Sequence, residues 1–189
     1  MMCLLRYVQN IQMRLSAYTF LCNNTERVLI MNKTSKKKIT AYTVFILIAE
    51  AVGVLSGLIT RGGIEAYGAL DKPAFTPPAI VFPIVWTVLF ALMGIGAARV
   101  YLTDPSSERT WGLGAFFIQL IVNFFWSIFF FNRQAFTFAF VWLLILLALV
   151  VIMTWLFSKS DKAAAYLQIP YIVWLIFAAV LNASVAAMN

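Results

Sequence analysis

The chain has 189 residues, of which 63% are hydrophobic and 11% charged, and its formal net charge is +7. Soluble domains contain about 45–50% apolar and about 25% charged residues, so this composition cannot form a water-exposed surface and predicts a membrane protein. A membrane-spanning helix takes about 20 residues, which leaves room for five or six spans and excludes a large soluble catalytic domain. The absence of histidine excludes imidazole general bases and histidine ligation of zinc or haem.

The first 30 residues differ from the rest of the chain, because no apolar run among them is long enough to span a membrane. They also lack the apolar core and cleavage site of a signal peptide. Met31 precedes a lysine-rich stretch and then a long apolar run, which is typical of the start of a membrane protein. We therefore predict that residues 1–30 are an N-terminal extension, non-physiological or disordered, and that residues 31–189 form the membrane domain. The alternative for residues 1–30 is an interfacial amphipathic arm.

From Ile39 onward, five continuous apolar segments are long enough to cross a membrane as helices, with polar or turn-forming residues between them. Their apolar residues do not alternate with polar ones, which excludes an outer-membrane β-barrel. We predict an all-α membrane protein, a five-helix bundle. Its helices are expected at about 39–60, 80–101, 111–131, 135–157 and 163–188.

The basic residues predict an orientation. The N-terminal region and the loops after the second and fourth helices hold 11 of the 14 Lys and Arg residues. The other side carries only Arg61, Lys72 and Arg133. The positive-inside rule therefore predicts a multi-pass protein of the cell membrane with a cytoplasmic N-terminus and a C-terminus outside. Basic charge at membrane ends is an ordinary topology signal, so nucleic acid is not an expected partner.

Polar side chains inside lipid are costly and usually face the interior of a bundle, where they mark candidate sites. At 100° per residue, one face of the third helix is polar and aromatic, and the second and fifth helices present aromatic faces with nearby amides. Core packing is the alternative for each aromatic residue, and an interhelical hydrogen bond is the alternative for each amide. The candidate ligand-binding residues on these faces are Trp86, Phe90, Gln119, Asn123, Trp126, Tyr171, Trp174, Ala178 and Asn182.

Glu50 is the only acidic residue in the middle of a predicted spanning helix. It fits either a proton- or cation-coupling carboxylate of a small transporter, or a protonated group that is hydrogen-bonded to a neighbouring helix. The other helix interiors offer no Lys or Arg as a partner, which weakens the coupling interpretation. Ala49, Gly53 and Gly57 form a ridge of small residues on the same helix, which favours close helix packing or dimerisation.

The first loop, residues 61–78, is the most distinctive stretch of the chain. Its three prolines restrict the backbone and favour an extended path into the second helix. Tyr67 and Phe75 add aromatic surface. This composition fits a lid across one mouth of the bundle and, equally, a stiff connector.

Three sequence motifs lie in, or lead into, three of the five predicted helices. They are K-P-x-F-x-P-P-x-x-V-F-x-x-x-W-T from Lys72, Q-x-x-x-N-x-x-W-S-x-x-F-F from Gln119, and P-Y-x-x-W-x-x-F-A-x-x-L-N from Pro170. In this order they resemble the TspO/MBR family, also described as the tryptophan-rich sensory protein, translocator protein or peripheral benzodiazepine receptor family. The resemblance covers about residues 39–189 and points to a bacterial-type member.

The resemblance implies a five-helix bundle, commonly a homodimer, with a cavity closed by the first loop. Family members bind tetrapyrroles such as protoporphyrin IX and haem, and also isoquinoline carboxamide and benzodiazepine-type ligands. The implied function is sensory or regulatory binding of a tetrapyrrole or another flat hydrophobic molecule. By motif position, Trp86, Asn123, Trp126 and Trp174 line the pocket and Tyr67 reaches in from the lid.

Some bacterial members are reported to promote light-dependent porphyrin degradation. The resemblance therefore makes Trp86 and Trp174 candidate catalytic residues for photo-oxidation. No metal site and no required cofactor are expected, because the tetrapyrrole acts as ligand or substrate. The alternative function is a small transporter of hydrophobic or porphyrin-like compounds that is coupled through Glu50.

Two departures from the family pattern matter. Many relatives carry an aromatic residue before the lid tyrosine, where this chain has Ala66, so a thinner lid contact is expected. Animal members place a basic residue after a tyrosine in a cholesterol-recognition pattern, whereas no basic residue follows Tyr171 here. Sterol transport is therefore not expected.

Overall fold

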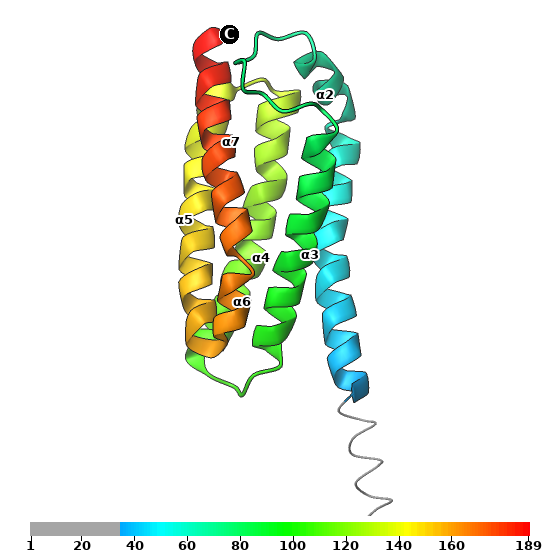
Figure 1. Cartoon of the computed structure of the whole chain (residues 1–189), viewed down its shortest axis with the longest axis vertical. Coiled ribbons are helices and arrows are strands. Elements are labelled where there is room, and N and C mark those ends of the chain that lie inside the picture. Colours follow the sequence, from blue (N-terminus) through cyan, green and yellow to red (C-terminus); the bar gives the residue numbers. More distant parts are fainter. Residues whose placement is uncertain (1–34) are drawn as a thin grey trace, which may run out of the picture. The chain divides into compact units, whose positions relative to one another are not determined.

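The computed structural model describes residues 35–189, and the predicted extension, residues 1–30, and the predicted start at Met31 lie outside this range. Residues 41–189 form one unit of packed helices (Figure 1). Five helices of the described part are long and apolar enough to cross a membrane, which confirms the predicted fold class. These spans are Ser35–Ile59, Val81–Tyr101, Ser107–Asn132, Phe136–Ser160 and Lys162–Met188.

The predicted segments agree with the spans to within four residues at each end. The second span is α3 (Val81–Tyr101) and the fourth is α5 (Phe136–Ser160). The third span begins as α4 (Ser107–Ser127), where the Ser106 side chain accepts a hydrogen bond from a backbone N–H of the first turn. It ends in a π-helical turn, η1 (Ile128–Asn132), which the apolar pattern of the sequence does not predict.

The fifth span is interrupted, although the sequence predicts one continuous helix. It consists of α6 (Lys162–Tyr166) and α7 (Ile169–Met188). Pro170 has no backbone N–H to donate to the preceding turn, so a continuous helix through this position would lose a hydrogen bond. In the structure Pro170 lies in the first turn of α7, where a proline is tolerated.

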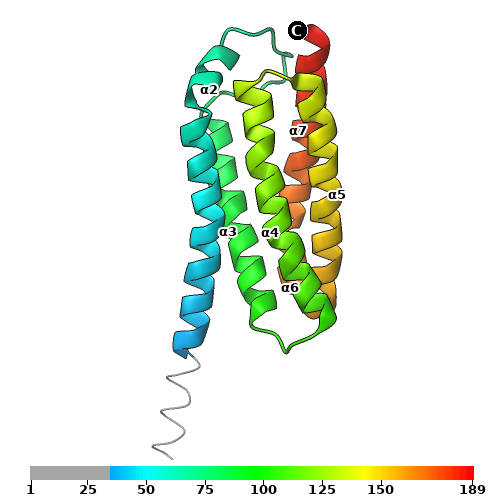
Figure 2. The ribbon, with the colours of Figure 1, turned by 180° about the vertical axis from the view of Figure 1, so that it is seen from behind.

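The first helix packs closely on α3. A Cβ atom on Gly94 of α3 would lie 2.6 Å from the Cα atom of Ile46, so only glycine allows this approach. The ring of the preceding residue, Phe45, lies 5.5 Å from the Tyr101 ring and 5.9 Å from the Phe116 ring. Phe45 thereby joins the first helix to both α3 and α4, and the first helix lies beside α3 in both views of the ribbon (Figures 1 and 2).

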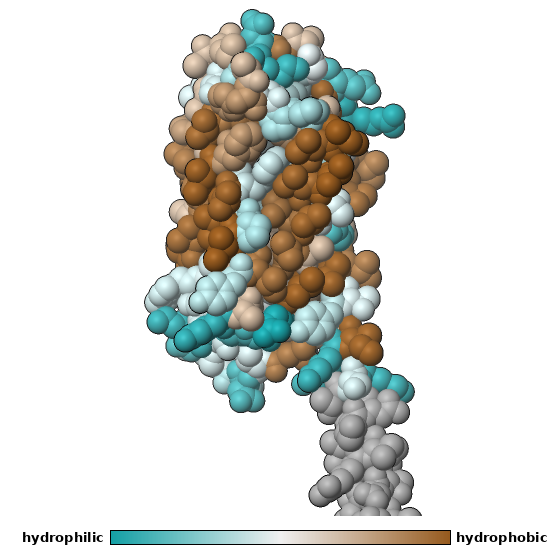
Figure 3. Space-filling view, in the orientation of Figure 1, coloured by the Kyte–Doolittle hydropathy of each residue, from teal (hydrophilic) through white to brown (hydrophobic). Residues whose placement is uncertain are grey.

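The middle of the bundle faces lipid. Large apolar side chains such as Ile84, Val88, Val173 and Ile176 are exposed. Figure 3 shows hydrophobic residues over the middle of the helices and hydrophilic residues near their ends. Five spans and this surface make the chain a multi-pass membrane protein.

The connection between the first helix and α3 contains a short helix, α2 (Arg61–Tyr67), that the sequence does not predict. Gly63 of α2 lies against η1 so closely that a Cβ atom would be 2.5 Å from the Phe131 carbonyl carbon. The Asn132 side chain donates a hydrogen bond of 3.1 Å to the Ile59 carbonyl. α2 therefore packs directly on the π-helical turn. The rest of the connection passes across the same end of the bundle (Figure 1).

Candidate ligand-binding cavity

A cavity of about 560 Å³ lies at the α2 end of the bundle. The first helix, α2 and its following loop, α3, α4 with η1, and α7 all contribute to its wall. Its volume falls within the range of about 300–1,000 Å³ that is typical of small-molecule sites. The wall is mainly aliphatic and aromatic, so the cavity suits a largely apolar ligand.

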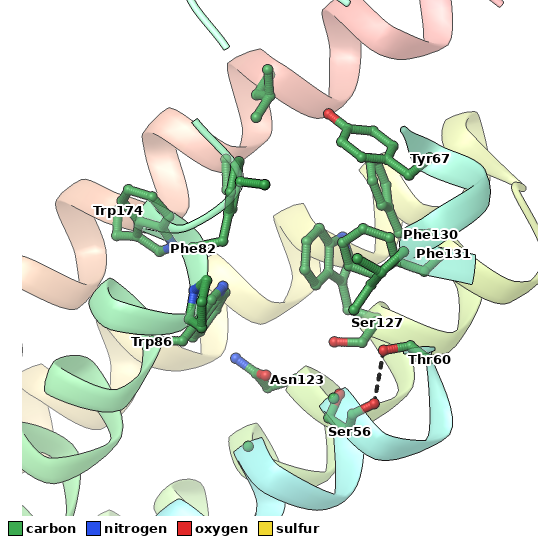
Figure 4. Close-up of a pocket in the computed structure, with 18 of the residues that line it drawn as sticks. Ser56, Thr60, Tyr67, Phe82, Trp86, Asn123, Ser127, Phe130, Phe131 and Trp174 are labelled. Atoms are coloured by element: carbon green, nitrogen blue, oxygen red, sulfur yellow. Dashed lines mark hydrogen bonds between the residues drawn. The ribbon is translucent and has the colours of Figure 1, made fainter. Parts of the chain in front are cut away.

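Tryptophan side chains from three helices meet in this wall. The Trp86 ring of α3 lies 6.4 Å from the Trp126 ring of α4 and 6.5 Å from the Trp174 ring of α7. The Trp86 and Trp174 rings are nearly perpendicular, at 88°. The Phe82 ring, one turn before Trp86, packs edge-on against Trp174 at 5.9 Å. Figure 4 shows Phe82, Trp86 and Trp174 together on one side of the cavity.

Tyr67 covers the cavity from the last residue of α2. Its ring lies 5.5 Å from the Phe130 ring and 5.6 Å from the Phe131 ring. These two phenylalanines are consecutive in η1, and both line the cavity. Burial raises the pKa of the Tyr67 hydroxyl, so this group is a neutral hydrogen-bond donor at physiological pH. Figure 4 shows the Tyr67 hydroxyl pointing away from α2.

A buried hydrogen-bond network fixes the amide of Asn123 in the wall. The Asn123 Nδ2 atom donates to the Tyr171 hydroxyl at 2.7 Å, and this hydroxyl donates to Gln119 Oε1 at 3.1 Å. Gln119 Nε2 in turn approaches the Met93 sulfur at 3.5 Å. Because the amide nitrogen of Asn123 is committed to Tyr171, its oxygen is the atom left to accept a hydrogen bond from a ligand.

Four residues of the wall carry a buried polar atom that has no hydrogen-bond partner within residues 35–189. The atoms are the Tyr67 hydroxyl, the indole nitrogens of Trp126 and Trp174, and Asn182 Oδ1. The other amide atom of Asn182 donates to the Phe136 carbonyl at 2.9 Å. An unsatisfied buried polar group costs about 1–3 kcal/mol, so four of them around one cavity favour a site that is completed by a ligand or by ordered water.

The wall contains two charged side chains among the residues that the structure describes. Glu50 contributes from the first helix, and Lys72 contributes from the loop after α2. Lys72 Nζ donates to the Gly68 carbonyl at 2.9 Å and lies 5.1 Å from the centre of the Tyr67 ring. No group of three or more His, Cys, Asp or Glu side chains in the described part of the chain could hold a metal ion.

The structure brings most of the predicted site residues together. Two of the ten, Gln119 and Tyr171, do not line the cavity, because they are fully buried behind Asn123 and support it. The eight that line it are Tyr67, Trp86, Phe90, Asn123, Trp126, Trp174, Ala178 and Asn182.

The predicted ligand-binding residues include none from the first helix, although this helix forms part of the wall. Glu50, Gly53 and Gly57, together with Thr60 directly after the helix, line the cavity at spacings of three and four residues, which place them on one helical face. Gly53 packs against the Phe90 ring, because a Cβ atom built on Gly53 would lie 2.5 Å from Phe90 Cε2. This contact confirms the packing interpretation of the small-residue ridge at Gly53. At Gly57 no atom lies within 4 Å of a Cβ position, so this glycine leaves open space in the cavity.

Comparisons with known proteins agree with these features. The TspO/MBR family model matches residues 45–188. A "Tryptophan-rich protein TspO" of Chlorobaculum tepidum is 34% identical over 155 residues, which are 81% of this chain and 98% of that protein. The "Translocator protein" of Ovis aries is 34% identical over 143 residues, which are 73% of this chain and 83% of the sheep protein.

A "Tryptophan-rich sensory protein" of Cereibacter sphaeroides is 32% identical over 125 residues, 66% of this chain and 77% of that protein. The family match covers all five spans from Phe45 onward, together with the lid connection and the cavity wall. The chain therefore belongs to the TspO/MBR family.

Proposed function

We propose that this membrane protein binds a tetrapyrrole, such as protoporphyrin IX or haem, in a sensory or regulatory role. The observation that carries the proposal is the cavity itself, in which aromatic rings from α2, α3, α4 and α7 surround about 560 Å³. A porphyrin is flat and apolar over its disc and polar at its edge. Indole and phenol faces can stack on such a disc. The unpartnered donors of the wall, which are the Tyr67 hydroxyl and the indole nitrogens of Trp126 and Trp174, can donate to polar edge groups.

The test is a titration of the purified protein with metal-free protoporphyrin IX and with haem, followed by the Soret band and tryptophan fluorescence. Metal-free protoporphyrin is expected to bind at least about as tightly as haem, because the chain has no histidine to ligate iron. Trp126→Ala should weaken binding, whereas Trp111→Ala, an exposed tryptophan outside the cavity, should not. Absence of saturable binding, or tight binding of haem alone, contradicts the proposal.

Light-dependent degradation of the bound porphyrin is the activity proposed for Trp86 and Trp174. In this scheme an indole gives one electron to the excited porphyrin, which leaves an indole radical cation and a porphyrin radical anion, and dioxygen is the oxidant consumed afterwards. The two rings are 6.5 Å apart in the wall. The double variant Trp86→Phe/Trp174→Phe should still bind porphyrin but lose the light-driven decay of the Soret band. Unchanged decay in that variant rejects the role.

Two further properties that the family suggests are also proposals for this chain. Isoquinoline carboxamide and benzodiazepine-type ligands are proposed to occupy the same cavity and should displace protoporphyrin competitively. A homodimer is proposed as the membrane form, and cross-linking in native membranes should trap it.

A second candidate function is transport of hydrophobic or porphyrin-like compounds with coupling through Glu50. The supporting observation is that Glu50 lines the cavity and has no ion-pair partner within residues 35–189. In proteoliposomes, uptake that depends on a proton gradient and disappears in Glu50→Gln supports this candidate. Full uptake by that variant discards it.

A further inference from the structure

The cavity has one charged side chain near its lid and one of opposite sign deeper in the bundle. Lys72 belongs to the loop that follows α2, and Glu50 lies nine residues before Ile59, the last residue of the first helix. At a rise of 1.5 Å per residue, Glu50 is about 14 Å from the end of that helix. The cavity therefore has a basic side chain at its lid end and an acidic side chain deeper in the bundle.

Lys72 is held in place, but its ammonium group still has N–H donors free for a ligand. Its ammonium donates one hydrogen bond to the Gly68 carbonyl and stands over the Tyr67 ring. An ammonium has three N–H donors, so two remain for a ligand. The Tyr67 hydroxyl is buried without a partner in the described part of the chain, which adds a third donor at the lid end.

The Glu50 end has the opposite character. When Glu50 is ionised, its carboxylate repels other carboxylates, and when it is protonated it offers a ligand carboxylate no positive charge. Neither of the two ion pairs within residues 35–189 includes it. Because the surrounding wall is apolar, the electrostatic effect of both charges is screened less than in water. A ligand carboxylate placed beside Glu50 would be buried without a counter-ion, which is strongly unfavourable.

We propose that Lys72 and Glu50 select and orient the ligand: the cavity takes a flat apolar molecule whose carboxylates all lie along one edge, and that edge meets Lys72 beneath the lid. This inference rests on the proposed function and adds the ligand's charge pattern and direction. It makes Lys72 a specificity-determining residue. It also excludes ligands that carry carboxylates on opposite edges.

The test compares protoporphyrin IX with its dimethyl ester, which keeps the macrocycle and removes both negative charges. Lys72→Gln should weaken binding of the diacid about tenfold, because it removes a charge-assisted hydrogen bond, and should change binding of the ester less than twofold. Lys72→Arg should restore most of the diacid affinity. The matched control is Lys159→Gln, which removes a lysine that stands 5.4 Å over the Trp155 ring outside the cavity and should change neither affinity.

The second half of the inference is tested with Glu50→Gln at alkaline pH, where the Glu50 carboxyl of the wild-type protein is ionised. The variant should tighten binding of the diacid several-fold and leave the ester within twofold. Equal losses for diacid and ester in Lys72→Gln would show that Lys72 only supports the lid, and would overturn the inference. No gain for the diacid in Glu50→Gln overturns the role of Glu50. If neither ligand binds the wild-type protein, the proposed function itself fails. This result differs from the outcomes above, in which the ligands bind but the variants do not change affinity as expected.

Discussion

At the scale of single residues, the Tyr171 hydroxyl is the centre of the network behind the cavity. It accepts from Asn123 and donates to Gln119, and all three side chains are buried. Tyr171→Phe leaves two buried amides without their partner, so we expect a loss of about 1–3 kcal/mol in unfolding free energy. Porphyrin affinity should fall as well, because the Asn123 amide is no longer held in one orientation.

Unfolding in detergent and a porphyrin titration measure these two effects. The control is Tyr166→Phe, since Tyr166 is exposed and makes no side-chain hydrogen bond in the described structure. A Tyr171→Phe protein as stable as the control would contradict the network.

Gly57 offers a way to fill the cavity without disturbing the bundle. No atom lies within 4 Å of its Cβ position, and it lines the cavity. Gly57→Leu should therefore fold, with stability unchanged or raised by the better helix propensity of leucine, and should lower porphyrin affinity at least tenfold by occupying space. Gly114→Leu is the matched control, because Gly114 also has open space at its Cβ position but does not line the cavity. Equal porphyrin affinities in the two variants would argue against this cavity as the site.

At the scale of elements, the lid contacts the α7 end through the Phe75 ring, 6.4 Å from the Phe177 ring, and through the Asn189 side chain. The Asn189 amide accepts from the Asp71 backbone N–H at 3.3 Å and donates to the Asp71 carbonyl at 3.0 Å. Each exposed hydrogen bond stabilises by about 0.5–1.5 kcal/mol, so Asn189→Ala should speed ligand dissociation several-fold by loosening residues 68–80. Stopped-flow dissociation and hydrogen exchange of that segment measure the change.

The control for the lid experiment is Ser184→Ala. Ser184 is also on α7, and its hydroxyl bonds only within its own helix, to the Val180 carbonyl. Dissociation rates that are the same in both variants would show that the Asn189 contact does not hold the lid.

At the opposite end of the bundle, Asp161 joins α3 to α6. Its carboxylate pairs with the Arg99 guanidinium at 2.8 Å and accepts from the Ala164 N–H at 3.0 Å as the cap of α6. Burial by itself raises the pKa of Asp161, but the Ala164 N–H and the Arg99 guanidinium outweigh it and hold the pKa below its ordinary value. The ionised Asp161 carboxylate therefore contributes its full stabilisation of the folded state above about pH 4. This contribution disappears as the pH falls through the lowered pKa of Asp161 in the folded state.

Asp161→Asn should then cost about 1 kcal/mol of unfolding free energy at neutral pH, and the difference from wild type should shrink below pH 4. Denaturation in detergent at several pH values measures it. Asp104→Asn, in the loop after α3, is the control and should behave like wild type at every pH, because Asp104 forms no ion pair in the described residues. A difference that does not depend on pH would contradict an ionic contribution.

At the scale of the whole molecule, the distribution of charge predicts the direction of insertion. Arg99, Arg109, Lys159 and Lys162 all lie at the end of the bundle opposite the lid. The positive-inside rule places that end in the cytoplasm and the lid and C-terminus outside. A periplasmic alkaline phosphatase fused after Asn189 should therefore be active, and green fluorescent protein fused there should be dark. Bright fluorescence would reverse the predicted topology.

Much of the fold could be predicted from the sequence because lipid imposes a simple rule. A continuous apolar run of about 20 residues has no alternative to a helix in a bilayer, so the five spans and their ends follow from composition along the chain. Eight of the ten predicted site residues line the cavity for a related reason, since polar and aromatic side chains that share one helical face turn away from lipid.

What the sequence left undetermined depends on contacts between distant segments. Phe130 and Phe131 of the π-helical turn both line the cavity, and the apolar pattern of the sequence does not predict that turn. Glu50 and Lys72 line one cavity only in the folded bundle, in which the first helix packs on α3. Helical periodicity shows which residues share a face but not which helix that face meets. For this protein, the sequence alone determined the spans and their inward faces, and the tertiary structure decided which of those faces enclose the cavity and which side chains support it from behind.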